Sequence, residues 1–177
     1  NTYGPVGGFG TRMFTVGVDG RDLFELDPSG YTSHFIWDDA RRITAWTRPP
    51  GQPPGFYRFT DRTREVQPIG AGVMTENGHN TNLTGRPDGW ILNDTYPSRG
   101  DRLQTLYLYH EPSARKVVLA RLHSPPPYVG EWRCDLHPRS SPDGRLVCVD
   151  SPHGGQGRQI YLVEVSGVTR EPRTSSR

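Results

Sequence analysis

Short apolar and alternating stretches, each bounded by turn residues, run along almost the whole chain. They have the lengths of β-strands, and many carry the β-branched or aromatic residues that suit a pleated, half-buried surface. The stretches expected as strands are residues 13–18, 23–26, 33–37, 43–46, 56–59, 65–69, 78–83, 90–94, 103–109, 116–120, 135–137, 146–149 and 159–165. No window places apolar residues at helical spacing without a proline or glycine, so very little helix is expected.

Turn residues separate these strands. Asp19-Gly20 predicts a hairpin between the first two, because glycine accepts the positive φ that tight hairpin turns need. An Asp-Pro-Ser-Gly run at 27–30 is expected to end the second strand. Pro-Asp-Gly occurs at 87–89 and again at 142–144, and both sites are predicted to be tight turns.

The stretch 133–150 combines three signals. Asp135, His137 and Arg139 alternate with apolar residues, so an extended backbone would place the three polar groups on one face. A Pro-Asp-Gly turn and the apolar residues 146–149 follow. The stretch is therefore predicted to be a polar strand, a turn and a buried strand.

The same order of strands recurs along the chain. His34, His79 and His137 each fall on the first and most polar strand of a round. Rounds of four short strands over ~40–50 residues are typical of propeller blades. The sequence thus predicts a partial β-propeller of the TolB or WD40 kind, with about three four-stranded blades plus a hairpin of another. Further blades are expected upstream of Asn1, and a self-contained β-sandwich is the alternative.

Composition narrows the class of protein. The 177 residues predict one domain, the partial propeller over 1–169, followed by a flexible tail over 170–177. The 21 basic and 19 acidic residues are interspersed, which does not indicate a nucleic-acid binder. No apolar run approaches the ~20 residues of a membrane span.

The aromatic residues and cysteines are expected mainly in the core. Trp37, Trp46 and Trp90 fall at strand positions. Trp132 is also assigned to the core, with a sugar-stacking platform as the alternative. Cys134 and Cys148 are expected as two reduced, buried thiols, and a disulfide between them is the alternative.

Two sets of residues are candidates for chemistry. His34, His79 and His137 would converge at one mouth of a central channel, and with Asp135 they could bind a divalent metal. The alternative is that they only form hydrogen bonds between blades. The second set consists of arginines, which would bind an acidic ligand if several of them lie near one channel. The alternative for each of them is an exposed arginine without a binding role. The members of this set are Arg12, Arg133, Arg139 and Arg158.

Several of these motifs together resemble the oligogalacturonate lyase family. The matching segments are Arg12, 33–37 (Ser-His-Phe-Ile-Trp), Gly78-His79, 93–97 (Asn-Asp-Thr-Tyr-Pro), 133–139 (Arg-Cys-Asp-Leu-His-Pro-Arg), 142–144 and 157–161 (Gly-Arg-Gln-Ile-Tyr). The resemblance extends from about Arg12 to Val165 and corresponds to the C-terminal half of that family.

The resemblance implies a seven-bladed propeller that holds a manganese-like ion in its channel, with Ca²⁺ or Zn²⁺ as alternatives. It implies β-elimination on oligogalacturonate or a similar acidic oligosaccharide. His79 and His137 correspond to metal ligands, joined by Asp135 and by Gln159 as the glutamine. His34 and Arg12 correspond to the residues near the abstracted proton, and Arg133, Arg139 and Arg158 would bind substrate.

The chain departs from the family in one motif. Where the family has Gln-x-x-His-x-His, this chain has Trp132, Asp135 and His137 at the three named positions. A carboxylate can replace an imidazole as a ligand, but an indole cannot replace the amide. This departure concerns the identity of the metal and of the substrate. The alternative function is a non-catalytic TolB-like propeller that serves as a binding scaffold, in which the three histidines need not converge.

Overall fold

The computed structural model of the chain describes residues 10–83 and 89–169, and these form antiparallel β-sheets with almost no helix. Their only α-helix is α1 (Ser166–Thr169), and two 3₁₀ turns are present, η1 (Glu111–Ser113) and η2 (Gly130–Trp132). The all-β prediction is confirmed. In the described part of the chain, no helix is long and apolar enough to cross a membrane.

The expected tail 170–177 and the Arg86-Pro87-Asp88 part of the first Pro-Asp-Gly turn lie outside the described residues. The chain forms two compact units, Asn1–Asn80 and Thr81–Arg177. The expectation of one domain over 1–169 stays a prediction.

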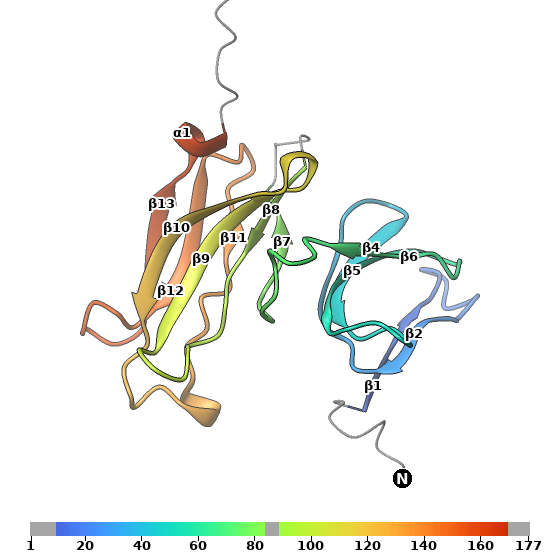
Figure 1. The fold of residues 1–177 in the computed structure, drawn as a ribbon, viewed down its shortest axis with the longest axis horizontal. Coiled ribbons are helices and arrows are strands. Elements are labelled where there is room, and N and C mark those ends of the chain that lie inside the picture. The colour runs from blue at the N-terminus through green and yellow to red at the C-terminus, as the bar shows by residue number, and fades with distance from the viewer. Residues whose placement is uncertain (1–9, 84–88, 170–177) are drawn as a thin grey trace, which may run out of the picture. The chain divides into compact units, whose positions relative to one another are not determined.

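The first unit consists of a hairpin and a four-stranded sheet (Figure 1). The hairpin pairs β1 (Thr11–Thr15) with β2 (Phe24–Gly30). The sheet runs in chain order through β3 (Ser33–Trp37), β4 (Arg42–Thr47), β5 (Gly55–Thr60) and β6 (Val66–Ile69). Met13 and Leu26 of the hairpin pack in one apolar cluster with Ile43, Tyr57 and Phe59 of the sheet.

The second strand does not stop at Leu26 as predicted, because β2 continues through residues 27–30 and ends at Gly30. The carboxylate of Asp27 is 1% exposed and accepts hydrogen bonds from the hydroxyls of Thr32 and Thr47 and from the backbone N–H of Ser29. Buried polar groups need such partners, so this turn-like sequence is held inside the sheet.

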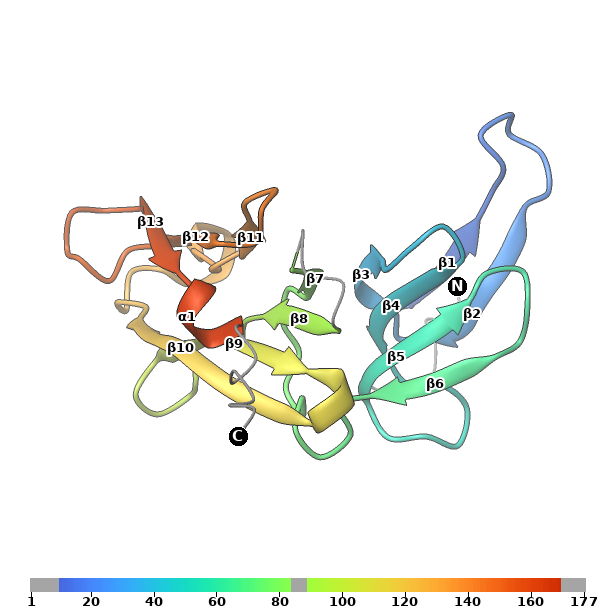
Figure 2. The same ribbon diagram turned by 90° about the horizontal axis from the view of Figure 1, so that it is seen from above.

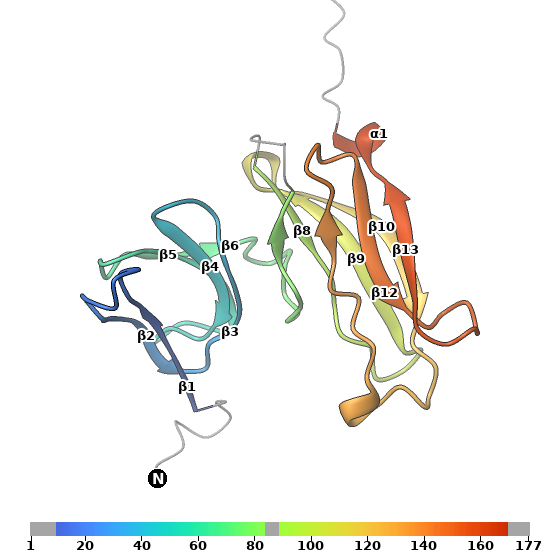
Figure 3. The same cartoon turned by 180° about the vertical axis from the view of Figure 1, so that it is seen from behind.

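The second unit contains two sheets (Figures 2 and 3). One has four strands in the order β10-β9-β8-β7, namely β7 (Thr81–Asn82), β8 (Trp90–Asn93), β9 (Leu103–His110) and β10 (Arg115–His123). The other has three, β11 (Arg139–Ser140), β12 (Leu146–Ser151) and β13 (Gln159–Glu164). Leu106 and Leu108 of β9 pack with Val147 and Val149 of β12, and Leu136 completes this core.

The described residues thus hold two four-stranded sheets, one three-stranded sheet and one hairpin. The thirteen stretches expected as strands agree in number with the thirteen strands of the described residues. The last sheet has three strands, and α1 follows β13.

Two of the four tryptophans are not in the core. Trp46 and Trp90 are buried as predicted. Trp37 lies with Phe35 on the outward face of β3 and is 44% exposed, and Trp132 on η2 is 74% exposed. Both core assignments are therefore wrong.

Both cysteines are free thiols. Cys134 is buried and Cys148 is half-buried.

Candidate functional site

Residues 133–138 do not form the predicted polar strand, since only Arg139 and Ser140 pair with β12. His137 has a φ of 43°, in the left-handed region, and this breaks the alternation of faces. Asp135 and Leu136 are both buried, whereas His137 is exposed. Leu136 enters the apolar core and its carbonyl accepts a hydrogen bond from the backbone N–H of Asp150 at 2.9 Å. The backbone of residues 133–138 therefore departs from a regular strand so that Leu136 can pack in the core.

The other two histidines of the series also differ from the prediction. His79 precedes β7 instead of lying within a strand. His34 lies in β3, but with a φ of 48° and a shift in the pairing register between Ser33 and Ile36. Left-handed backbone is costly for residues other than glycine and often occurs at functional sites.

The loop 133–138 forms a pocket with neighbouring strands of the second unit. The pocket has a volume of about 280 Å³, and its lining residues are Arg133, Cys134, Asp135, His137, Asp150 and Arg158. A carboxylate oxygen of Asp135 and a ring nitrogen of His137 lie within 4.8 Å of each other. Four predicted site residues are thus brought together here, namely Arg133, Asp135, His137 and Arg158.

Arg133 holds the Asp135 carboxylate. Its Nε lies 2.6 Å from Oδ1 and 2.8 Å from Oδ2, and the Asp135 side chain is only 7% exposed. The guanidinium also lies over the ring of Tyr96, 4.6 Å from its centroid, a cation–π arrangement. Burial raises the pKa of Tyr96, and the negative charge of Asp135 adds to this, while Arg133 opposes it.

Arg158 is fixed by the backbone of η2. Its Nη2 donates to the carbonyl of Trp132 at 2.6 Å, and its guanidinium lies 5.9 Å from the ring centroid of Tyr128. Burial raises the pKa of the Cys134 thiol, and Arg158 partly offsets that effect. Cys134 is therefore a neutral thiol near pH 7 and is poorly suited to act as a nucleophile.

Two predicted residues of the same unit do not line this pocket. Arg139 is exposed, and its Nη1 donates to the carbonyl of Pro138 at 2.8 Å. Gln159 is exposed at the start of β13, and its Nε2 donates to the carbonyl of Gln156 at 3.1 Å.

In the first unit His34 lies against His79. The two rings meet edge to face, with centroids 4.6 Å apart and planes at 85°. Nδ1 of His34 is hydrogen-bonded to Oγ of Ser33, which fixes the orientation of the ring. Arg12 lies on β1, where its Nη1 is 3.1 Å from Oε1 of Glu25.

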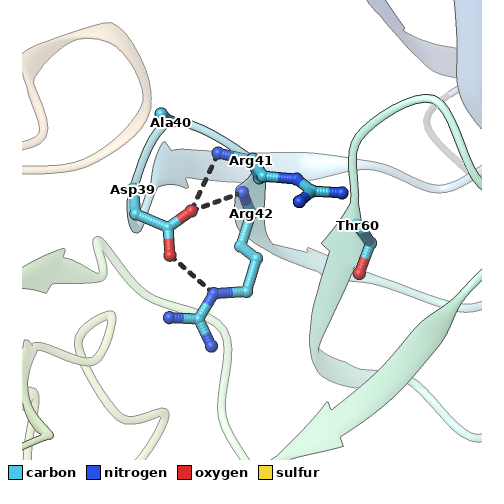
Figure 4. Close-up of a pocket in the computed structure, with 5 residues that line it drawn as sticks. All are labelled: Asp39, Ala40, Arg41, Arg42 and Thr60. Atoms are coloured by element: carbon cyan, nitrogen blue, oxygen red, sulfur yellow. Dashed lines mark hydrogen bonds and ion pairs between the residues drawn. The ribbon is translucent and has the colours of Figure 1, made fainter.

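A pocket of the first unit, of about 350 Å³, lies at the turn between β3 and β4 (Figure 4). The carboxylate of Asp39 accepts hydrogen bonds from the backbone N–H groups of Arg41 and Arg42, at 2.8 and 2.9 Å, and from Nε of Arg42 at 2.7 Å. These bonds, the backbone bond from Arg41 first, lower the pKa of Asp39. The carboxylate thus stabilises its own turn, and no predicted site residue lines this pocket.

Besides Cys134, which was assigned to the core, three residues of the candidate site were missed from the sequence. Tyr96 lies beneath Arg133, Tyr128 lies beneath Arg158, and Asp150 lines the pocket. Asp150 could have been found from the sequence. It lies two residues after Cys148, so in a strand extended past residue 149 both side chains would lie on the same face. Tyr96 also had a signal, because it lies in the matching segment 93–97, whereas Tyr128 had none.

No family model and no curated protein matches the sequence. Solved structures do match. An oligogalacturonate lyase from Vibrio parahaemolyticus superimposes with a TM-score of 0.67 over 90% of this chain, at 17% identity. The chain shares its fold with oligogalacturonate lyase. A second structure, an oligogalacturonate lyase in complex with manganese, gives the same TM-score over 90% of the chain at 18% identity.

At this identity the likeness to oligogalacturonate lyase establishes the fold alone. The chain covers 43% of the first structure and 42% of the second, so it spans less than half of their length. Its sheets therefore form part of a β-propeller, and the propeller prediction is confirmed over the β-sandwich alternative.

Proposed function

We propose that this chain is part of a lyase that cleaves oligogalacturonate, or a similar acidic oligosaccharide, by metal-assisted β-elimination. One observation carries the proposal. Within the fold of an oligogalacturonate lyase, one pocket gathers the carboxylate of Asp135, the imidazole of His137 and the guanidinium of Arg158. These groups suit a metal ion and an anionic substrate.

The proposed metal ligands are His79, Asp135, His137 and Gln159. Imidazole nitrogen with carboxylate and amide oxygen is a donor set that manganese, calcium or zinc can accept, and Mn²⁺ is favoured because a related structure contains manganese. Gln159 lies outside the lining of this pocket, and since its Nε2 donates to the carbonyl of Gln156, its Oε1 is the atom that would bind the ion. A bound divalent ion would supply positive charge for the uronate carboxylate, next to which negative charge develops during elimination.

His34 is the proposed base that removes the proton at C5 of the uronate. Neutral imidazole is available near pH 7, and a hydrogen bond in which Nδ1–H donates to Oγ of Ser33 would leave Nε2 as the basic nitrogen. Arg12 is proposed to stabilise the charge that forms there. A guanidinium has five N–H donors, and the contact with Glu25 leaves others for a uronate.

The proposed substrate-binding residues are Arg133, Arg139 and Arg158. Each has a polar anchor, Arg133 in the carboxylate of Asp135, Arg139 in the carbonyl of Pro138 and Arg158 in the carbonyl of Trp132. Anchored guanidinium groups with remaining donors bind carboxylates at a lower entropic cost.

Further blades of the same propeller, expected upstream of Asn1, are the proposed structural partners. One face of the three-stranded sheet packs in the core, whereas Ile160 and Leu162 on the other are 73% and 68% exposed. In a propeller such a face is covered by the next blade.

Two measurements test the proposed function. The purified protein should bind about one divalent ion per chain, and His137→Gln should weaken binding whereas His123→Gln, at an exposed histidine that ends β10, should not. With metal present, digalacturonate should yield the ultraviolet absorbance of a 4,5-unsaturated uronate. A protein that resists metal loading and gives no such product from a panel of uronides would refute the proposal.

A further inference from the structure

An exposed tryptophan with a fixed backbone lies beside the candidate pocket. Trp132 ends η2, and its side chain is 74% exposed. Its N–H donates to the carbonyl of Val129 at 3.0 Å, and its own carbonyl accepts from Nη2 of Arg158 at 2.6 Å. The backbone is therefore held from both sides while the indole remains in solvent.

The position of Trp132 links it to the pocket in two ways. The next residue, Arg133, lines the pocket, and so does Arg158, which bonds the Trp132 carbonyl. The guanidinium of Arg158 also lies over the ring of Tyr128, 5.9 Å from its centroid. One hydrogen bond thus joins the backbone of an exposed aromatic residue to a guanidinium that lines the pocket.

We propose that Trp132 is a stacking platform for a sugar ring of the substrate, and that Arg158 binds a carboxylate of the same saccharide. The inference rests on the proposed function and adds a substrate contact outside the metal ligands. The flat C–H face of a sugar packs well on an aromatic ring, which offers a large apolar area at a small cost in rotamer freedom. Arginine is suited to bind the uronate carboxylate with two parallel hydrogen bonds.

Direct binding measurements in EDTA separate this proposal from catalysis. Calorimetric titration of the metal-free protein with digalacturonate should show binding. Trp132→Ala should weaken it about tenfold, equivalent to about 1.4 kcal/mol. Trp132→Phe should retain most of the affinity because a ring remains. Val129→Ala truncates another exposed apolar side chain of the same loop, 51% exposed, and should leave binding unchanged.

The two roles are distinguished with a neutral ligand. Digalacturonate dimethyl ester lacks the carboxylate charges but keeps the sugar faces. Trp132→Ala should weaken both ligands by a similar factor, whereas Arg158→Gln should weaken only digalacturonate. Ligand binding should also shift the tryptophan emission of the wild type to shorter wavelength, and this shift should disappear in Trp132→Phe.

The results of these binding experiments can be distinguished from the results of the lyase test. Metal-free wild type that does not bind digalacturonate, or Trp132→Ala that binds as tightly as wild type, overturns the platform even if the protein is an active lyase. Binding that depends on Trp132 in a protein without lyase activity supports the platform and counts against the lyase. Because the indole is mostly in solvent, unchanged thermal unfolding of Trp132→Ala should show that the variant folds.

Discussion

Arg133 is the main charged neighbour of the buried Asp135 carboxylate. Its Nε lies within 2.8 Å of both oxygens. Arg133→Met should lower the free energy of unfolding by about 1.5–3 kcal/mol, the range for a hydrogen bond to a charged group, because the carboxylate loses its donor. Urea unfolding measures this, with Arg121→Met, an exposed position on β10, as control.

A double-mutant cycle sharpens this prediction. Asp135→Asn removes the charge, so adding Arg133→Met to it should cost less than Arg133→Met costs alone. An Arg133→Met variant no less stable than Arg121→Met would contradict the assigned role of the pair.

The thiol of Cys134 should react slowly at neutral pH. Burial raises its pKa, and the carboxylates of Asp150 and Asp135 add to the shift while Arg158 opposes it. Because the thiolate is the reactive form, a raised pKa lowers its fraction at pH 8. In a Cys148→Ala background, iodoacetamide labelling of the folded chain should rise with pH later than that of the same chain in urea. Coinciding pH profiles would contradict the raised pKa.

At the candidate site, the sequence predicted which residue types take part but not their backbone conformation. Asp135, His137 and Arg158 were recognised by chemical type, and they do line one pocket. The strand predicted for Asp135 and His137 was wrong, because alternating side chains require extended φ values and His137 has a φ of 43°. The assignment of Trp132 to the core was wrong for another reason. The apolar character of a residue does not tell whether its side chain on a 3₁₀ turn will face the core or solvent.

The Pro-Asp-Gly turn shows what the sequence predicts well at the level of elements. The N–H of Gly144 donates to the carbonyl of Ser141 at 2.9 Å, and Gly144 has a φ of 64°. The carboxylate of Asp143 accepts hydrogen bonds from the hydroxyl of Ser141 and the N–H of Arg145. These residue types have few alternatives at their positions, so the turn and the strand after it were predictable.

Gly144→Ala tests the geometry of this turn. An L-residue in the left-handed region costs about 1–2 kcal/mol, so the variant should be destabilised by that amount in urea unfolding. Gly100→Ala is the matched control, because its φ is not positive and an added Cβ there meets no atom within 4 Å. Equal stability of the two variants would contradict the turn.

The polar first strands were the elements least predictable from sequence. β7 and β11 have two residues each, far fewer than the stretches expected there. In the second unit the long strands β9 and β10 form most of the backbone pairs of their sheet, and Leu136 packs in the apolar core. Neither effect leaves a trace in local periodicity, because both depend on contacts between distant segments.

For the molecule as a whole, the repeated rounds of strands predicted the propeller, and two complete four-stranded sheets match them. The sequence did not predict how the last round is completed. On that sheet Cys148 pairs with Leu162 and Asp150 pairs with Ile160, so these side chains share one face of β12 and β13. Val147 and Val149 point to the other face and are buried in the core.

The uncovered face should make the isolated 177-residue chain self-associate. Ile160 and Leu162 are mostly exposed, and fully burying such side chains contributes roughly 1.5–3 kcal/mol each. Sedimentation velocity should therefore show association that increases with concentration, and Ile160→Thr with Leu162→Thr should reduce it. Val129→Thr removes an exposed apolar group from a loop instead and should leave association unchanged. A chain that stays monomeric at high concentration, with or without these changes, would show that this face needs no covering blade.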